Sequence, residues 1–548
     1  MKTLTALLLF FGCFSNQIQA ETNPPSYCPN AFASAAGSKP DEILHSKIAQ
    51  LQATRSTSDL EQLREFYEAC GYAPIWVRDG QVTPSAKAVL QEIQSAAERG
   101  LDPNDYSYSL EAPSEPMTMT EDSINLYTKF ELNLSLGALL LARDLRCGRI
   151  APKTLHAGLP APCDGFIPGE FVWKLSRTTN PSLAFDLLEP AAPGFIRTKE
   201  ALHRYLALSR GPQTVLPRLH GAGKSQQLLF DPAAIRAILT ETGDLAPANP
   251  ITGTPSDEAF VLATRSFQTR HGLPAEGAIT VESYKALAVP MQNRVAQLGL
   301  TLERWRWVQR TFSEPPIVVN IPEFRVRAYD TNLRVALSMK VIVGGAYHRR
   351  TPVFQNQISS VIFRPYWNIP TSIQHNEVEP AMRRDHAYLA KHGYEIVRTG
   401  DGKMRIRQRP GDQNALGLIK FLLPNIHDVY LHGTPAQNLF DRTRRDFSHG
   451  CIRVENPVAL ATWILRDNPG WTAEKIKYAM HGNQTFSVTV PHPIPVLIVY
   501  GTGFAAEDNT VYFLPDIYNQ DAELEALLHT LSRTRRQQSE ILSGSVRR

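Results

Sequence analysis

The sequence predicts a multidomain α+β protein, mainly helical in its N-terminal part and β-rich nearer its C-terminus. Its 548 residues correspond to about three or four domains at roughly 100–200 residues per domain. A hydrophobic content of 43% is typical of globular proteins with buried hydrophobic cores. The spacing of apolar residues changes from helical to alternating near residue 316, which separates the two parts.

The N-terminal part, residues 41–210, is predicted to be a mainly helical domain. An amphipathic helix is expected from Ser85 to Arg99, because apolar residues recur at helical spacing and Gly100 follows as a stop. The stretch from Leu126 to Arg146 carries leucine and alanine on several faces. We therefore expect a long helix there that is buried on most sides.

Two shorter units follow in the sequence. Residues 215–290 form a second helical unit, in which a helix from Phe260 to His271 is ended by Gly272. Residues 291–315 are predicted to be a connecting helix. The tail, residues 501–548, is predicted to be a strand and helix segment that packs on the N-terminal helical domain.

The β-rich domain is expected over residues 316–500. Short runs rich in Val, Ile and aromatic residues alternate there with Pro, Gly and Asn. Residues 371–405 are charged and interrupt this pattern. Asn456 and Pro457 form an N-cap and first-position pair that opens a helix.

The first residues, 1–20, have the pattern of an export signal. Leu4 to Phe14 is an apolar stretch too short to span a bilayer as a stable helix, and an imperfect cleavage site ends at Ala20. An uncleaved membrane anchor is the alternative. Residues 21–40 are predicted to be a linker, and the mature chain is expected to be soluble outside the cytoplasm with no stable membrane span. The net charge of +4 is not gathered into one basic run, so no nucleic-acid partner is expected.

The cysteines fit an oxidising compartment. Once Cys13 is removed with the export signal five remain, of which four lie in the N-terminal third and allow two disulfides with three possible connectivities. Buried free thiols are the alternative for some of them. These four are Cys28, Cys70, Cys147 and Cys163. Cys451 is left over, and an unpaired cysteine in an exported protein is a candidate reactive thiol.

The candidate chemistry lies in the segment from Ser448 to Val454, which contains His449, Gly450 and Cys451. A thiol becomes an acyl-accepting nucleophile when an imidazole takes its proton, and His432 stands nineteen residues before Cys451. Gly450 lets the backbone approach a substrate, and the amides of Gly450 and Cys451 are the candidate oxyanion donors. Zinc held by His432, His449 and Cys451 is disfavoured because paired short spacing is missing. No metal or cofactor is expected.

The motifs around these residues resemble the L,D-transpeptidase catalytic domain, through the pairing of Leu431-His432-Gly433-Thr434 with Ser448-His449-Gly450-Cys451-Ile452-Arg453. The supporting stretches match the large Gram-negative members of that family in order along residues 316–520. Such stretches include Val319-Asn320-Ile321-Pro322, Val341-Ile342-Val343-Gly344, Thr351-Pro352, Pro365-Tyr366-Trp367-Asn368-Ile369-Pro370, Asn414-Ala415-Leu416-Gly417 and Lys420-Phe421. Upstream, Gly100-Leu101-Asp102-Pro103 and Gly148-Arg149-Ile150 resemble that group's helical scaffold domain.

A second resemblance covers about forty residues within 215–290. The order from Phe267 through Leu273 to Thr280 resembles a small three-helix peptidoglycan-binding module. Glu276 stands where that pattern has Asp, and Thr280 where it has Gly. A generic helical linker domain is the alternative.

The resemblance implies a reaction and roles for individual residues. Cys451 would attack the bond between meso-diaminopimelate and D-Ala of a tetrapeptide stem, and a second stem's amine would then form a 3→3 cross-link. His432 would act as general base and then acid, oriented by the carbonyl of Gly433. His449 and Arg453 would shape the site and hold a carboxylate, and Tyr430 would line the cleft. Residues 371–405 correspond to a capping insert.

The resemblance also implies substrate-binding residues, partners and a cellular location. Trp367 and Tyr366 are substrate-binding candidates, with an ordinary core role as the alternative. The partners implied are peptidoglycan tetrapeptide stems as donor and acceptor, together with other cell-wall enzymes, and the implied location is the periplasm. Gly433-Thr434 replaces the Asp-Thr of several large relatives. L,D-carboxypeptidase activity, attachment of a lipoprotein to the wall, and non-catalytic wall binding remain alternatives.

Overall fold

The computed structural model describes residues 39–53, 58–106, 110–118, 120–160, 163, 165–216, 231–247, 256–346, 349–398, 400, 402 and 404–543. The predicted export signal at 1–20, nearly all of the linker at 21–40 and Cys28 lie outside this set. Among the described residues, no helix is both long and apolar enough to cross a membrane.

The N-terminal helices pack around one long central helix, α4 (Glu121–Cys147). Its side chains from Leu132 to Ala142 are buried without a break, which agrees with the expectation of burial on most sides. The helices that contact it are α1 (Lys39–Ala53), α2 (Ser58–Ala69), α3 (Pro84–Gln94) and α5 (Pro168–Leu175), and α6 (Pro181–Asp186) packs on α3. The next helix, α7 (Pro193–Arg210), has a separate core. A small hairpin of β1 (Val77–Arg78) and β2 (Gln81–Val82) joins α2 to α3.

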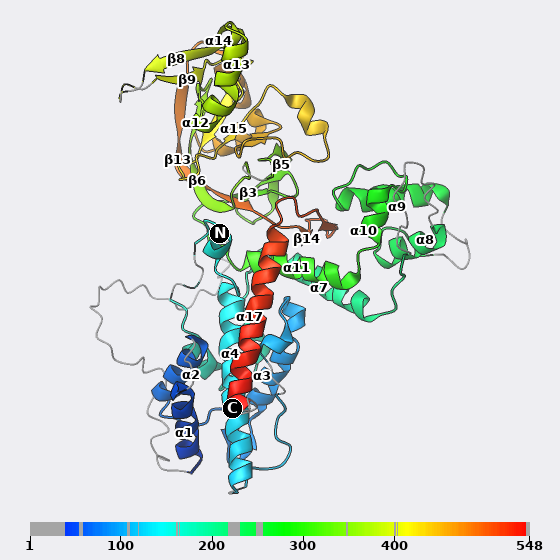
Figure 1. Ribbon diagram of the computed structural model, residues 1–548, viewed down its shortest axis with the longest axis vertical. Helices are drawn as coiled ribbons and strands as arrows, with labels where there is room; N and C mark the ends of the chain where they lie inside the picture. The colour runs from blue at the N-terminus through cyan, green and yellow to red at the C-terminus, as the bar shows by residue number, and fades with distance from the viewer. Residues whose placement is uncertain are drawn as a thin grey trace, which may run out of the picture.

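The last helix, α17 (Gln520–Ser543), returns from the far end of the chain and runs beside α4 (Figure 1). Arg535 of α17 donates to both carboxylate oxygens of Asp144 in α4, at 2.7 and 3.0 Å. Both side chains are almost fully buried, so removing either partner would leave a buried charge unpaired. The C-terminal segment is therefore an integral part of the helical domain.

The described cysteines are partly paired. Cys147, at the end of α4, forms a disulfide with Cys163, and Cys70 is also disulfide-bonded. Cys451 is free. Of the three connectivities that the sequence allowed, those without a Cys147–Cys163 bond are excluded.

A separate helical unit, here called the three-helix module, contains α8 (Pro232–Glu241), α9 (Asp257–Arg270) and α10 (Val281–Leu287). These helices share a hydrophobic core of their own that includes Ile238, Phe267 and Leu287. The connecting helix α11 (Met291–Trp305) follows and packs against α7. Figure 1 shows the module to one side of both the helical domain and the β-rich domain.

The β-rich domain is built on a closed eight-stranded barrel, with the strand order β10-β11-β12-β5-β4-β3-β13-β6. Alternate side chains fill its interior, and α15 (Pro457–Ile464) and α16 (Ala473–His481) cover part of the outside. The strands are β3 (Ile317–Asn320), β4 (Arg325–Tyr329), β5 (Val335–Ile342), β6 (Phe354–Phe363), β10 (Ile419–Leu422), β11 (Leu431–His432), β12 (Ile452–Val454) and β13 (Phe486–Val499).

The capping insert between β6 and β10 is larger than the charged segment 371–405. It has a three-stranded sheet of its own, in the order β7 (Trp367–Asn368), β9 (Met404–Gln408), β8 (Tyr394–Arg398). Trp367 pairs with Gln408, so the insert begins before and ends after the predicted bounds. The charges alternate along β9 because one face of this small sheet is exposed. Its helices are α12 (Thr371–Ile373), the π-helical segment Gln374–Val378, α13 (Glu379–Arg384) and α14 (Tyr388–Lys391).

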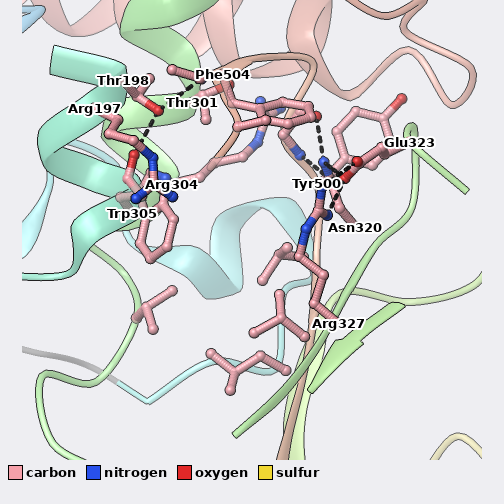
Figure 2. A pocket seen from close by; sticks show the side chains of 18 of the residues that line it. Arg197, Thr198, Thr301, Arg304, Trp305, Asn320, Glu323, Arg327, Tyr500 and Phe504 are labelled. Atoms are coloured by element: carbon pink, nitrogen blue, oxygen red, sulfur yellow. Dashed lines mark hydrogen bonds and ion pairs between the residues drawn. The ribbon is translucent and has the colours of Figure 1, made fainter. Parts of the chain in front are cut away.

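A pocket lies between the barrel and the helices α7 and α11, and Figure 2 shows the polar side chains among its lining residues. Arg327 of β4 forms two hydrogen bonds with Glu323, at 2.6 and 2.7 Å. Asn320 at the end of β3 donates to the carbonyl of Gly501 at 3.0 Å. The hairpin of β14 (Gly503–Ala505) and β15 (Val511–Phe513) extends from there, and the Ala505 amide donates to Thr198 of α7 at 3.2 Å.

Candidate active site

Three polar side chains stand side by side on the outer face of the barrel. His432 of β11 is the register partner of Lys420 on β10 and of Arg453 on β12. Successive side chains of a strand point to opposite faces, and the neighbours of these residues along each strand fill the barrel core. Those inward neighbours are Ile419, Phe421, Leu431, Ile452 and Val454. Lys420, His432 and Arg453 therefore share one outward surface.

Cys451 joins this surface at the start of β12. β11 and β12 are parallel, and the Ile452 amide donates to the Tyr430 carbonyl at 3.0 Å, which places Cys451 beside Tyr430. The Tyr430 hydroxyl interacts with the Cys451 thiol and with Trp367. The Lys420 ammonium lies 3.7 Å from the centroid of the Tyr430 ring. The thiol, the phenol, the imidazole and two cations thus form one cluster.

His432 is held as a neutral base. Burial, the positive charge of Arg453 and that of Lys420 lower its pKa to about 3, against the opposing effect of backbone hydrogen bonds to Gly433 and Leu416. Its Nδ1 lies 2.5 Å from the carbonyl oxygen of Gly433. A carbonyl only accepts, so Nδ1 carries the proton and Nε2 presents its lone pair. The predicted orienting role of Gly433 agrees with this geometry.

Cys451 is a neutral thiol at rest. Burial raises its pKa above the ordinary value, although hydrogen bonds to Tyr430 and the charges of Lys420 and Arg453 act in the opposite direction. The thiol is 3.6 Å from the carbonyl oxygen of Asp428, and the structure records no hydrogen bond from it to His432.

The turn that carries Cys451 depends on Ser448 and Gly450. The Ser448 hydroxyl accepts from the Gly450 amide at 3.1 Å and donates to the Cys451 carbonyl at 2.5 Å. Gly450 has φ +119°, a conformation that residues with a Cβ rarely adopt. Because its amide is already engaged, Gly450 is not a free oxyanion donor, which corrects that expectation. Among the hydrogen bonds of the described residues, none uses the Cys451 amide.

Buried hydrogen bonds of Thr351 and Tyr518 hold the same turn in place. The fully buried Thr351 hydroxyl donates to the Gly450 carbonyl at 2.8 Å and accepts from the Gly344 amide at 2.8 Å. The Tyr518 hydroxyl accepts from the Thr351 amide at 3.2 Å and donates to the Gly344 carbonyl. Neither Thr351 nor Tyr518 was predicted from the sequence to belong to the site.

His449 faces the capping insert. Its Nε2 lies 2.6 Å from Glu377 Oε1, in the π-helical segment, and the same carboxylate accepts from Arg349 at 2.9 Å. His449 therefore connects the nucleophile loop to the insert. Nothing in the sequence pointed to Glu377, because it lies 72 residues away from His449.

The two remaining aromatic candidates belong to the capping insert. Trp367 packs against that insert's core and against Tyr394, with ring centroids 6.5 Å apart. Tyr366 is 38% exposed, and the Arg407 guanidinium lies 4.0 Å above its ring. Trp367 thus reaches the site through Tyr430, whereas Tyr366, which precedes β7, packs on Arg407 of β9.

Lys420 and Arg453 supply the positive charge of the site. The Nε atom of Arg453 is buried and has no hydrogen-bond partner among the described residues. Lys420 was missed as a site residue, although its alternation with Ile419 and Phe421 on a strand was a usable signal. The described residues contain no group of three or more His, Cys, Asp or Glu side chains that could hold a metal ion.

Comparison with known proteins gives matches in both halves of the chain. The family model of the L,D-transpeptidase catalytic domain, YkuD, matches residues 315–486, and the scaffold domain model matches residues 61–202. A curated Haemophilus influenzae protein named "Putative L,D-transpeptidase" is 35% identical over 225 residues, which is 38% of this chain and 45% of that protein. The match thus spans about half of the relative's length.

A solved structure described as the Ldtfm–avibactam carbamoyl enzyme aligns with 55% of this chain and 98% of its own, at 11% identity. Its TM-score of 0.17 is too low to carry a structural argument. The candidate site at Cys451 lies within the match to the catalytic-domain model. Residues 315–486 thus belong to the L,D-transpeptidase catalytic-domain family, and residues 61–202 to the scaffold-domain family that matches the helical part.

Proposed function

We propose that this protein joins peptidoglycan stem peptides by 3→3 cross-links through a thioester on Cys451. The observation that carries the proposal is the single outward surface shared by Cys451, His432, Arg453 and Lys420. A free thiol beside a neutral imidazole supplies the nucleophile and the base of acyl transfer, and the two cations provide positive charge for substrate carboxylates.

Acylation begins when the Cys451 side chain turns toward His432. Nε2 takes the thiol proton while Sγ attacks the carbonyl carbon of meso-diaminopimelate that is bonded to D-Ala. The C–N bond then breaks, the imidazolium gives its proton to the leaving amine, and D-Ala departs. Burial and two neighbouring cations make the imidazolium unstable, so it releases that proton readily.

Transfer to the acceptor reverses these roles. The side-chain amine of a second stem's diaminopimelate attacks the thioester carbonyl and passes a proton to His432. The C–S bond breaks, and the imidazole returns the proton to sulfur. The Cys451 amide, which is not engaged by the described residues, is the proposed oxyanion donor, in place of a Gly450 and Cys451 pair.

Arg453 is the proposed partner of a substrate carboxylate. Its buried Nε has no hydrogen-bond partner, and a carboxylate would satisfy that donor. Tyr430 and Trp367 would form the wall beside the reacting bond, and His449 would position the insert above it through Glu377. A role of Tyr366 in binding has less support, because it packs on Arg407.

Product analysis with purified disaccharide-tetrapeptide tests the proposal. Wild-type protein should form the 3→3 dimer and release D-Ala, whereas Cys451→Ala should form neither. Lys477→Ala, an exposed change on α16, is the matched control and should behave as wild type. Equal product from wild type and Cys451→Ala would refute the cysteine mechanism. Tripeptide in place of dimer would instead identify an L,D-carboxypeptidase.

Covalent labelling provides a second test of the nucleophile. A carbapenem should acylate Cys451, and intact-mass spectrometry should show one adduct that is absent from Cys451→Ala. The proposed location is the periplasm, reached through the signal at 1–20. N-terminal sequencing of exported protein should find a new terminus after residue 20, and an intact N-terminus would indicate a membrane anchor.

A further inference from the structure

The peptide unit between Gly450 and Cys451 is held in its orientation through the Gly450 carbonyl. The Thr351 hydroxyl donates to this carbonyl at 2.8 Å. A trans peptide unit is planar and its C=O and N–H groups point in opposite directions, so the same hydrogen bond sets the direction of the Cys451 amide. Gly450 has φ +119°, and a glycine backbone rotates more freely than that of any other residue. The direction of the proposed oxyanion donor therefore depends on Thr351.

Thr351 is itself fixed by two buried partners. Its hydroxyl accepts from the Gly344 amide at 2.8 Å, and its amide donates to the Tyr518 hydroxyl at 3.2 Å. The Tyr518 hydroxyl donates in turn to the Gly344 carbonyl. Burial raises the pKa of Tyr518 to about 12, so the hydroxyl keeps the proton that it donates. Tyr518 thus closes a ring of hydrogen bonds with Gly344 and Thr351.

Gly344 connects this ring to the other end of the turn. It forms a parallel β-bridge with Ser448, whose hydroxyl bonds both the Gly450 amide and the Cys451 carbonyl. A Cβ on Gly344 would overlap the Arg349 carbonyl oxygen, so the backbone is closely packed at this point. A displacement of Gly344 would therefore be transmitted to the turn through Ser448 as well as through Thr351.

Tyr518 belongs to the C-terminal segment and not to the strands of the barrel. It lies just before α17, whereas the match to the catalytic-domain model ends at residue 486. Its amide donates to the Tyr500 hydroxyl at 2.9 Å, and the two rings stack with centroids 5.8 Å apart. Asp521, in the first turn of α17, accepts from Arg304 of α11 at 2.5 Å. Helices outside the barrel, which Figure 1 shows below it, thus help to determine where the Tyr518 hydroxyl lies.

We propose that Tyr518 is a positioning residue for acyl transfer at Cys451. Acting through Thr351, its hydroxyl keeps the Cys451 amide directed at the oxygen of the tetrahedral intermediate. The inference rests on the proposed function for the reaction, and it extends the support of the active site to a residue of the C-terminal segment. Because the amide stabilises a negative charge that develops only in acyl transfer, simple alkylation of the same thiol should not depend on Tyr518.

Two reactions of the Cys451 thiol in the full chain separate positioning from a general structural effect. With p-nitrophenyl acetate, Sγ bonds to the carbonyl carbon through a tetrahedral oxyanion, the C–O bond to p-nitrophenolate breaks, and the thiol proton passes through His432 to solvent. With iodoacetamide, Sγ displaces iodide and no oxyanion forms. Cys451→Ala gives the background rate of each reaction.

Tyr518→Phe, which removes only the hydroxyl, should slow acetylation and leave alkylation unchanged. We expect acetylation to be about tenfold slower than in wild type, since the amide remains but is less well directed, and complete loss of an oxyanion donor costs roughly a hundredfold or more. On disaccharide-tetrapeptide, kcat should fall while KM stays the same. Tyr512→Phe removes a hydroxyl from β15 of the same segment and, as the matched control, should behave as wild type.

Variants of Thr351 test whether Tyr518 acts through that residue. Thr351→Ser keeps the hydroxyl and should stay near wild type, whereas Thr351→Val should slow acetylation at least as much as Tyr518→Phe. The double variant Tyr518→Phe, Thr351→Val should be no slower than Thr351→Val alone, because the two residues act in series.

An equal loss of acetylation and alkylation in Tyr518→Phe would indicate a general structural effect and would overturn the inference. Acetylation at the wild-type rate, or losses that add in the double variant, would also overturn it. If Thr351→Val does not fold, the comparison of the two reactions in Tyr518→Phe still decides the matter. Failure of the proposed function would appear separately, as a wild-type protein that is acetylated at Cys451 but releases no D-Ala from disaccharide-tetrapeptide.

Discussion

His449 and Glu377 form a contact of 2.6 Å that joins the nucleophile loop to the capping insert. The two residues belong to segments that fold as different parts of the catalytic domain. Glu377 is also 2.9 Å from Arg349. Its carboxylate therefore links the capping insert both to the loop of His449 and to the segment that contains Arg349. The position of the insert is thus coupled to the residue two places before Cys451.

Glu377→Gln should loosen this contact while leaving both folded parts intact. The groups involved are partly exposed, and such pairs contribute roughly 0.2–1 kcal/mol. Hydrogen exchange in residues 371–384 should become about twofold to fivefold faster, with a larger effect on KM than on kcat. Glu379→Gln, on the same insert but paired with His375, is the control. Equal exchange in Glu377→Gln and wild type would contradict the coupling.

Lys420→Met should make Cys451 harder to ionise. The Lys420 charge lowers the pKa of the thiol, so its removal should raise that pKa further. A neighbouring charge commonly shifts a pKa by one unit or more, so the rate of alkylation by iodoacetamide at neutral pH should fall about tenfold. The pH profile of alkylation should move to higher pH. Lys420→Arg keeps the charge and should stay near wild type.

Acid should destabilise the catalytic domain through His432. Its folded pKa of about 3 lies below the unfolded value near 6.5, so between these two pH values the unfolded chain binds the extra proton. Stability therefore falls as pH decreases through this window, by up to roughly 1 kcal/mol per pH unit. Urea unfolding at several pH values should show a shallower slope for His432→Gln. Parallel slopes would show that the imidazole is not held neutral.

Gly450→Ala should reduce catalysis by straining the nucleophile turn. The added Cβ has space, since the nearest atom is 3.7 Å away, but φ +119° is unfavourable for alanine. Strain of this kind costs about 1–3 kcal/mol, and a shifted thiol should lower kcat about tenfold or more. Gly400→Ala, in open space within the insert, should leave kcat unchanged. Steady-state rates on disaccharide-tetrapeptide measure both.

The Cys147–Cys163 bond should stabilise the helical domain. It links the end of α4 to a residue sixteen positions later, and closing such a loop contributes about 3 kcal/mol. Cys147→Ser, Cys163→Ser and the double variant should lose the same free energy of unfolding, because each removes the same bond. A larger loss in the double variant would point to a different pairing.

The sequence by itself determined the local elements and singled out Cys451 as the proposed nucleophile. β3 begins at Ile317, where the alternating pattern was predicted to start, and α15 begins at Pro457 with Asn456 accepting from the Ala459 amide at 3.0 Å. These features depend on neighbours in the chain, so periodicity and capping reveal them. The motif around Cys451 likewise identified the family.

Only the tertiary structure decided which distant residues meet. The antiparallel pairing of β11 with β10 and its parallel pairing with β12 bring Lys420, His432 and Arg453 into one row, and no local pattern specifies which strands become neighbours. The sequence also did not predict three contacts: the hydrogen bond from the Gly450 amide to Ser448, the contact of Glu377 with His449, and the Cys147–Cys163 disulfide. Each arises from closure of the barrel and packing of the helices, where contacts between remote segments determine the free energy.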